Sequence, residues 1–169
     1  SRPWLHSIWP SMSLCLRDWE IQKGRRHPGT FTAIVIRVME VVLPRGTKVA
    51  ADPNSPEIRN KVLETLRKSL RGVDIVGILG ENRIMLLLPM TPLHGARVVL
   101  DKVLKLLRRQ VYTIQGVQAR VEFCMTAIPF SRSRIPTVES LVDAAEKSLL
   151  RLMASYSKTR LLPKADQRN

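Results

Sequence analysis

Arg71 and Asp74 form the one R-x-x-D pair in this sequence, and arginine is the side chain best suited to forked recognition of phosphate or guanine. The guanidinium of an arginine donates two parallel hydrogen bonds that match O6 and N7 of guanine. A carboxylate beside it can accept hydrogen bonds from N1–H and N2–H₂ of the same base. The pair therefore indicates either a ligand site or a structural Arg–Asp contact that closes a turn, and the residues alone leave both readings open.

The chain is strongly basic, with 28 Lys and Arg residues against 14 Asp and Glu residues and a net charge of +14. Such a charge favours an anionic partner, such as nucleic acid, a nucleotide or an acidic membrane, although a solvated basic surface without a partner fits it equally well. Aromatic residues make up only 5% of the chain. Few stacking platforms are then available for single-stranded nucleic acid, which disfavours nucleic acid as the partner.

The sequence holds no cluster of metal ligands. Its histidines and cysteines are scattered, at His6, His27, His94, Cys15 and Cys124. None of them shows the spacing that is typical of zinc ligands, and we expect neither a metal nor another cofactor. The 169 residues suit one domain, and no apolar run reaches the roughly 18 residues that a membrane span requires. Since the chain also opens without a secretory signal, we expect a cytoplasmic location.

The elements that would carry these residues follow from hydrophobic periodicity. Residues 30–43 are apolar and β-branched, which predicts a strand that is buried on both faces. Four shorter apolar runs predict two β-hairpins, namely 74–79 with 84–89 around a four-residue turn at 80–83, and 111–114 with 117–127 around Gln115 and Gly116.

Three helices are predicted between and after these strands. Ser55, Pro56 and Glu57 give an N-cap, a first-turn proline and an acid near the positive end for the first of them, which runs to about Leu70. The other two begin at Thr91-Pro92, running to about Arg109, and at Pro136-Thr137, running to about Tyr156. This order predicts an α+β fold with a central, mostly antiparallel sheet, flanked by helices that cover one side of it.

Composition divides the chain into three parts. Residues 1–28 carry an apolar stripe at helical spacing, made of Trp4, Leu5, Ile8, Trp9, Met12, Leu16 and Trp19. Because this stripe is too apolar to face water, we expect a helix that packs on the domain or pairs with the same helix of a second copy as a homodimer. Residues 29–162 form the predicted domain, and 163–169 form a polar tail.

Over roughly residues 17–162 the sequence resembles the GGDEF domain, the diguanylate cyclase-like branch of the nucleotidyl cyclase superfamily. Members carry R-x-x-D, five residues, then Gly-Gly-Asp/Glu-Glu-Phe on a hairpin turn, and then an apolar strand that ends in proline. This chain reads Arg71-Gly-Val-Asp74, IVGIL, Gly80-Glu-Asn-Arg-Ile84 and MLLLP in the same register without a gap. The resemblance implies a bacterial signal-transduction module with further domains of a parent protein upstream or downstream.

The resemblance also assigns a ligand to the R-x-x-D pair. In the family this pair belongs to the inhibitory site for the product, cyclic di-GMP, so Arg71 and Asp74 are expected to bind that ligand. A further arginine of the site corresponds to Lys102, which keeps the charge and loses the forked geometry.

Cyclase activity, in contrast, is not expected. The family holds Mg²⁺ through a carboxylate late on the first strand and another at the third turn position, and this chain has Arg37 and Asn82 there, followed by Arg83. A guanidinium repels Mg²⁺ and offers it no lone pair. Other substrate-binding positions of the family are replaced by Pro56, Glu81, Met153 and Ser157. We therefore expect no catalytic residues and no enzymatic activity.

Three functions follow from these features. The first is a catalytically inactive GGDEF-like receptor for cyclic di-GMP. The second is a dimerisation or protein-interaction module that works without a ligand through its N-terminal helix. The third is a basic domain that binds nucleic acid, which the low aromatic content disfavours.

Overall fold

The computed structural model describes residues 31–71, 75–80, 82–130 and 138–161 of the 169-residue chain. The predicted N-terminal helix within 1–28, the polar tail 163–169 and Asp74 lie outside these ranges. Within them, the strands and helices follow one another in the predicted order. None of the helices in these ranges combines the length and the apolar character that crossing a bilayer requires.

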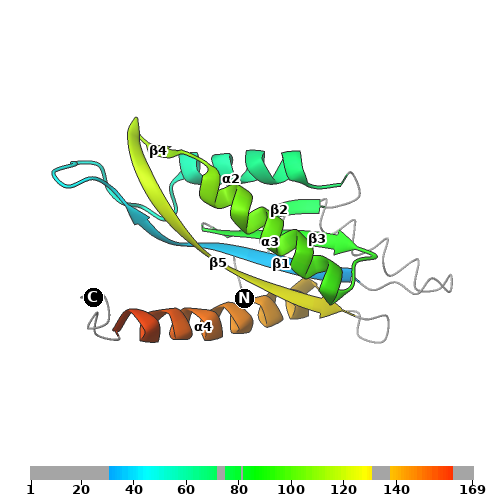
Figure 1. Cartoon of the computed structure of the whole chain (residues 1–169). Helices are drawn as coiled ribbons and strands as arrows, with labels where there is room; N and C mark the ends of the chain where they lie inside the picture. Colours follow the sequence, from blue (N-terminus) through cyan, green and yellow to red (C-terminus); the bar gives the residue numbers. More distant parts are fainter. Residues whose placement is uncertain (1–30, 72–74, 81, 131–137, 162–169) are drawn as a thin grey trace, which may run out of the picture.

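A five-stranded sheet forms the centre of the domain, with the strand order β2-β3-β1-β5-β4 (Figure 1). The strands are β1 (Phe31–Val42), β2 (Ile75–Gly80), β3 (Arg83–Pro89), β4 (Tyr112–Ile114) and β5 (Val117–Phe130). Each pair of neighbouring strands is antiparallel. The predicted antiparallel sheet and both predicted hairpins, β2–β3 and β4–β5, are thereby confirmed.

β1 lies in the middle of the sheet and is buried on both faces, as its composition predicted. Ala33, Ile34 and Val35 have no exposed surface. β1 pairs with β3 on one edge and with β5 on the other. A strand that is apolar on both faces needs a covering layer on each side of the sheet.

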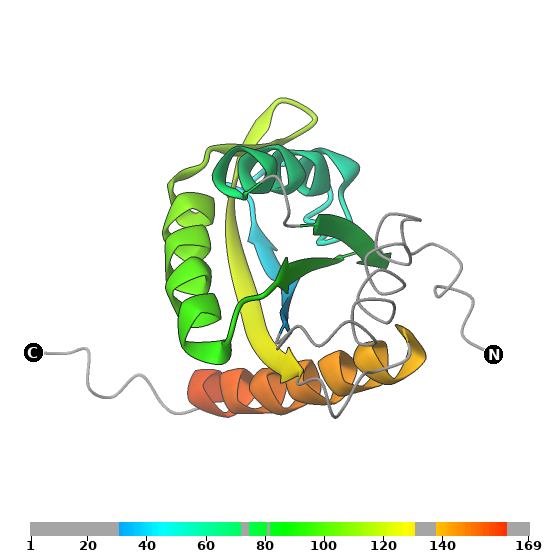
Figure 2. The same ribbon diagram turned by 90° about the vertical axis from the view of Figure 1, so that its right-hand side faces the viewer.

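Helices supply cover on both sides, so the prediction that they cover only one side was wrong. The described helices are α2 (Pro56–Ser69), α3 (Leu93–Arg109) and α4 (Val138–Leu161). Figures 1 and 2 show α2 and α3 on one face of the sheet and α4 on the other. The physical reason is the two-sided apolar character of β1, because one of its faces would otherwise be left in water.

The core on the α2–α3 side joins alternate residues of the central strands to the apolar faces of the two helices. Its buried members include Ile34, Ile36, Ile84, Leu86, Ile58, Val62, Leu66, Ala96, Val103 and Leu107. On the opposite side, Ala145 and Leu149 of α4 are fully buried. Alternate side chains of each strand therefore belong to two separate apolar cores, one on each face of the sheet.

The β2–β3 turn is shorter than the four residues predicted. Gly80 and Arg83 are paired across the hairpin, which leaves residues 81–82 as the turn, and the register shifts between Ile78 and Gly80. The β4–β5 turn is at Gln115 and Gly116, as predicted, with φ angles of 48° and 77°. Two left-handed residues in succession match the right-handed twist of the flanking strands.

Ser55 occupies the N-cap position of α2, followed by Pro56 and Glu57, as predicted. The Ser55 side chain is buried and makes no cap hydrogen bond, and its backbone carbonyl accepts from the N–H of Arg59 at 3.1 Å. Pro92, and not Thr91, occupies the N-cap position of α3. Glu57 in the first turn of α2 accepts a hydrogen bond from the N–H of Gln115 at 2.9 Å, which fixes the tip of the β4–β5 hairpin to this helix.

Tyr112 provides a test of how β4 is anchored. Its side chain is buried, and its hydroxyl donates a hydrogen bond to the carbonyl of Leu107 at 2.6 Å, near the end of α3. We expect Tyr112→Phe to lower the free energy of unfolding by about 1 kcal/mol, because that carbonyl loses a donor inside the protein. Urea unfolding measures the change. Val111→Ala, at an exposed neighbouring position, is the control and should have little effect.

Tyr112 should also make the free energy of unfolding depend on pH in the alkaline range. Burial raises the pKa of Tyr112 far above the ordinary value of about 10 for tyrosine. Below about pH 10 the phenol is neutral in both states, and above it the unfolded chain ionises first, so stability is lost as the pH rises toward the folded-state pKa. Wild-type stability should fall more steeply above pH 10 than that of Tyr112→Phe. Equal slopes would contradict this assignment.

Candidate functional site

Arg71 lies just beyond the end of α2, and its guanidinium is hydrogen-bonded to the side chain of Thr91. One Nη2–H donates to Oγ1 of Thr91 at 2.8 Å, and the same nitrogen is 3.5 Å from the carbonyl oxygen of Pro89. Arg71 itself is exposed. The contact ties the turn between α2 and β2 to the loop ahead of α3, so the guanidinium has a defined position on the surface.

Thr91 is itself held firmly. It is only 7% exposed, and its Oγ1 donates to the carbonyl of Pro89 at 2.9 Å while accepting from Arg71. Its carbonyl accepts a hydrogen bond from Oγ1 of Thr32 on β1 at 2.8 Å. Arg71 is thus connected through a buried threonine to the central strand. Sequence analysis missed this role of Thr91, because its position before Pro92 suggested a helix cap instead.

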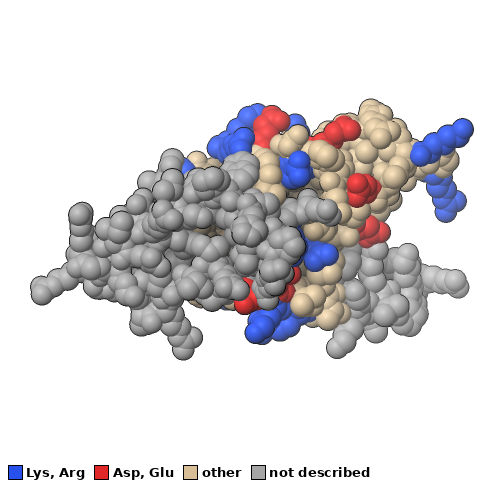
Figure 3. All heavy atoms as spheres, turned by 180° about the vertical axis from the view of Figure 1, so that it is seen from behind, with Lys and Arg blue, Asp and Glu red and all other residues tan. Residues whose placement is uncertain are grey.

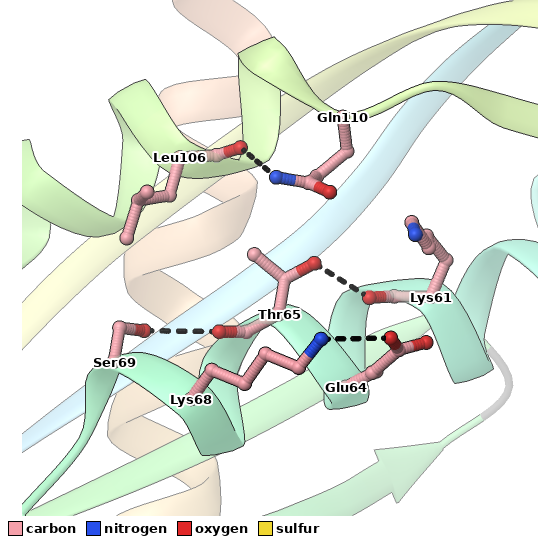
Figure 4. Close-up of polar contacts among 7 residues, drawn as sticks. All are labelled: Lys61, Glu64, Thr65, Lys68, Ser69, Leu106 and Gln110. Atoms are coloured by element: carbon pink, nitrogen blue, oxygen red, sulfur yellow. Dashed lines mark hydrogen bonds and ion pairs between the residues drawn. The ribbon is translucent and has the colours of Figure 1, made fainter.

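Lys102 is exposed on α3, on the side of the sheet where α2 also lies. Figure 4 shows α2 and α3 next to each other and running in opposite directions, with Thr65 beside the turn of α3 that holds Leu106. Lys102 is one helical turn before Leu106, and Arg71 is two residues past the end of α2. Arg71 therefore lies at the end of this layer where α3 begins, because it bonds to Thr91, whereas Lys102 lies near the middle of α3.

The separation of the two cations limits how a ligand could contact both. Lys102 is about 14 Å along the axis of α3 from Leu93, at roughly 1.5 Å per residue, whereas Arg71 bonds to Thr91 ahead of that helix. A ligand that engages both must extend along the junction of α2 and α3 or draw Arg71 away from Thr91. Asp74, the predicted partner of Arg71, lies outside the described residues.

Polar side chains at the junction of α2 and α3 bond back to their own helices. The Oγ1 of Thr65 donates to the carbonyl of Lys61 at 2.8 Å, and the Nε2 of Gln110 donates to that of Leu106 at 3.1 Å (Figure 4). Lys68 forms an exposed ion pair with Glu64 at 3.1 Å, and both the Lys68 hydrogen bond and the charge of Lys61 lower the pKa of that carboxyl. Lys68 therefore contributes less uncompensated charge to the site than its position suggests.

The structure brings Arg37, Asn82 and Arg83 together at the other end of β3. Arg37 and Arg83 are directly opposite each other in the pairing of β1 with β3. The N–H of Val38 donates to the carbonyl of Asn82 at 3.0 Å, and the side-chain amide of Asn82 donates back to the carbonyl of Val38 at 3.3 Å. The amide of Asn82 thus closes the turn against β1.

Arg83 forms an ion pair with Glu146 of α4, in which the side chains are 18% and 23% exposed. Sequence analysis missed Glu146, although an acid between the inward-facing Ala145 and Leu149 is a signal for a buried partner. The pair connects the hairpin turn to the helix on the far side of the sheet. It also compensates one of the two positive charges at this end of β3.

Arg37 sets the electrostatic character of the same region. Across from it on β5 lies Cys124, whose thiol has a pKa raised by burial and partly lowered again by the Arg37 charge. Within the described residues, no group of three or more His, Cys, Asp or Glu side chains is placed to hold a metal ion. Because Glu146 compensates Arg83, the guanidinium of Arg37 is the charge that repels a divalent cation here.

Two other positions that differ from the family pattern are described. Pro56 is the first residue of α2 and is exposed, where it supplies neither a carboxylate nor an N–H group. Met153 is half-buried on α4. Glu81 and the side chain of Ser157 lie outside the described part of the chain.

The fold was compared with those of known proteins, and solved structures superpose on it. No protein-family model matches the sequence, and neither does any curated protein. The solved structure of the diguanylate cyclase SiaD in complex with its activator SiaC, from Pseudomonas aeruginosa, superposes with a TM-score of 0.63 at 20% identity, covering 85% of this chain and 54% of that one. The chain therefore spans about half of that protein.

Two further solved structures cover nearly the whole comparison chain. The GGDEF domain of FimX from Pseudomonas aeruginosa gives a TM-score of 0.62 at 14% identity, over 86% of this chain and 94% of that domain. A DGC protein from Thermotoga maritima gives 0.57 at 13% identity, over 82% and 92%. The described residues thus form an α+β domain with a curled antiparallel sheet. Its fold is that of a GGDEF domain, as the motif register indicated.

The Arg83–Glu146 pair generates a stability prediction. Glu146→Gln should lower the free energy of unfolding by about 1–2 kcal/mol, because a mostly buried guanidinium loses its counter-ion. Urea unfolding at neutral pH measures the loss. The matched control is Glu64→Gln, which removes the exposed pair with Lys68 and should leave stability unchanged. Equal losses in the two variants would show that the Arg83 pair behaves like an ordinary surface pair.

Proposed function

We propose that this chain is a catalytically inactive GGDEF-like signalling domain that binds cyclic di-GMP through Arg71, Asp74 and Lys102. The observation that carries the proposal is the exposed guanidinium of Arg71, which Thr91 orients at the junction of α2 and β2. Such a receptor would act in a bacterial cytoplasm as one part of a longer signalling protein.

The residues at the β2–β3 turn support the absence of catalysis. Joining two GTP molecules requires carboxylates that hold Mg²⁺ beside the triphosphate. Arg37 and Asn82 stand where the family has these carboxylates, and the Asn82 amide is bonded to the carbonyl of Val38. Arg83 adds a second guanidinium next to them. A divalent cation would meet positive charge and no anionic ligand from these three residues.

The proposed ligand contacts follow from the chemistry of guanine. A bidentate contact between an arginine and O6 and N7 contributes about 1–3 kcal/mol, and a carboxylate can read the N1–H and N2–H₂ edge. Lys102 supplies charge for a phosphate but lacks the fork of arginine. We therefore expect micromolar affinity, which corresponds to about 8 kcal/mol of binding free energy.

A second candidate is an interaction module that needs no ligand. The Arg71–Thr91 hydrogen bond is also what a purely structural brace between α2 and the loop before α3 would look like. The SiaD structure was solved in complex with its activator SiaC, which favours a protein as the alternative partner of a domain with this fold. In this case Arg71→Ala would lower stability, and cyclic di-GMP would not bind.

Nucleic acid is a weaker candidate. Among the described residues that are visible in Figure 3, Lys and Arg side chains stand in separate groups with acidic and uncharged side chains between them. Backbone-tracking nucleic-acid sites concentrate positive charge along one groove. Binding of a DNA or RNA oligonucleotide that falls steeply with salt, without a preference for cyclic di-GMP, would support this candidate.

The proposal predicts that the chain makes no cyclic di-GMP from GTP with Mg²⁺ or Mn²⁺. The physical reason is that Arg37 and Asn82 replace the metal-binding carboxylates. Chromatographic detection of the product measures it, with Arg37→Ala as the matched control. Product from the wild-type chain above that control would disprove the proposed inactivity.

The proposal also predicts a calorimetric binding isotherm with cyclic di-GMP that depends on Arg71. Arg71→Ala should weaken binding by about tenfold or more, since the fork to guanine is lost. Asp74→Asn should reduce the preference for guanine more than the affinity for phosphate. Arg120→Ala removes the same charge from an exposed site on β5 and serves as the control.

Three outcomes separate the candidates. Equal binding of cyclic di-AMP and cyclic di-GMP, or a wild-type isotherm from Arg71→Ala, would assign the binding to the general basic charge. No heat at high ligand concentration, together with a stability loss in Arg71→Ala, would favour the interaction module. Selective binding that Arg120→Ala leaves intact would support the receptor.

A further inference from the structure

The outer edge of β5 is much longer than the strand that pairs with it. β4 has three residues and pairs only with Val117–Ala119, whereas β5 continues to Phe130 (Figure 1). On its inner edge, β5 pairs with β1 as far as Phe130. Among the described strands, none pairs with residues 120–129 of β5 on the outer edge. We call this stretch the open edge.

The hydrogen bonds of the sheet show which backbone groups face the open edge. The N–H of Val38 bonds to the carbonyl of Asn82, so the odd-numbered residues of β1 before Val38, such as Arg37, bond to β5 instead of β3. Arg37 is opposite Cys124, so the even-numbered residues along this part of β5 bond back to β1. The hairpin gives the same phase, since Val117 directly follows its two-residue turn. The backbone groups of the odd-numbered residues therefore point to the open edge.

Phe123, Met125 and Ala127 present their N–H groups on the open edge. Their side chains are uncharged and half-buried against the core under α2 and α3. Sheet edges that avoid pairing with other chains usually carry charges, prolines or bulges. Pro129 faces the same edge, where the missing N–H of a proline breaks no hydrogen bond, and it ends the row of donors. The three donors before it have no charged side chain among them that would oppose pairing.

A groove lies beside the end of this edge, between β5 and α4. Its volume is about 630 Å³, and it is lined by residues 127–129 of β5 and by one face of α4 that includes Asp143, Lys147 and Arg151. Lys147 and Arg151 are exposed and one helical turn apart, so they lie on the same face of the helix. The carboxylate of Asp143 leaves this face with one net positive charge. The open edge is therefore next to a groove that favours an anionic occupant.

Side chains along β5 alternate between the two faces of the sheet. Thr126 faces α4, because its hydroxyl oxygen lies 2.6 Å from that of Ser148, whereas Ala127 packs toward α2 and α3. A strand added to the open edge would alternate in the same way. Its side chains opposite Thr126 and Ile128 would point toward the cations of α4, where acidic groups are favoured. The side chains between them would lie beside the core under α2 and α3, where apolar groups are favoured.

We propose that the open edge and the groove bind an extended segment of a partner protein, in which acidic and apolar side chains alternate. The segment adds a strand to the sheet, and its backbone accepts the hydrogen bonds that β5 offers. A second copy of β5 fits this edge less well. Antiparallel pairing of two copies would place both α4 helices on one face and bring their cations together, in a chain with a net charge of +14. The proposal uses neither Arg71 nor Lys102 and is independent of cyclic di-GMP.

Hydrogen exchange with a synthetic peptide tests the proposal, because strand addition protects particular amides. The probe is a peptide of about seven residues in which glutamate alternates with valine, which matches the roughly 20 Å from Phe123 to Pro129. The amides of Phe123, Met125 and Ala127 should exchange about tenfold more slowly when the peptide is bound. Those of Cys124 and Thr126 already bond to β1 and should not change. The control peptide has lysine in place of glutamate and should protect none of them.

Variants of the full chain test the two parts of the surface by fluorescence titration of the labelled peptide. Ala127→Pro removes one donor from the open edge and should weaken binding by about tenfold. Ala127→Val is the matched control, because it has a similar size and keeps the N–H. Reversing both cations of the groove, Lys147→Glu with Arg151→Glu, should weaken binding by about tenfold as well. The same reversal at Lys105 and Arg109, an exposed pair on α3, is its control and should have a smaller effect.

Several results would overturn the proposal. One is an absence of binding by the acidic peptide, and another is binding that leaves the exchange of the Phe123, Met125 and Ala127 amides unchanged. Equal affinities of Ala127→Pro and Ala127→Val, with both shown to be folded by circular dichroism, would also contradict it. If Ala127→Pro does not fold, the exchange of these amides in the wild type decides the matter. A wild-type dimer in analytical ultracentrifugation that Ala127→Pro dissociates would assign the open edge to a second copy instead.

Discussion

The two-sided burial of β1 is the constraint on which the rest of the structure depends. The strand is hydrogen-bonded on both edges, to β3 and to β5, and its apolar side chains point to both faces. Buried backbone groups need partners and buried side chains need cover, so β1 requires two neighbouring strands and a layer of helix on each side. Arg37 stands near the end of this buried stretch, where a half-exposed polar residue is tolerated.

β3 connects the two regions to which the sequence assigned function. Its first residue, Arg83, lies at the hairpin turn with Arg37 and Asn82, and its last, Pro89, accepts hydrogen bonds from Thr91 beside Arg71. Seven residues of strand put these ends about 20 Å apart. The proposed ligand site and the turn are therefore distinct places at the two ends of one strand.

The arginines at these places are positioned by partners from distant parts of the chain. Thr91 holds Arg71, and Glu146 holds Arg83. An arginine with a fixed hydrogen-bonding partner loses less conformational freedom when it binds a ligand. This fits the proposed recognition role for Arg71, whose guanidinium is exposed, whereas the mostly buried Arg83 holds α4 against the turn.

The sequence alone determined the order and type of the described elements, the two-sided burial of β1 and the β4–β5 turn at Gln115 and Gly116, because periodicity and turn chemistry are local properties. It also determined that Arg37 and Asn82 stand at the two positions where the GGDEF pattern has carboxylates. Only the tertiary structure decided that α4 covers the second face, that the β2–β3 turn has two residues, that Thr91 braces Arg71 and does not cap α3, and that Glu146 pairs with Arg83. These are contacts between residues far apart in the chain, and they depend on how the layers pack, which no local pattern specifies.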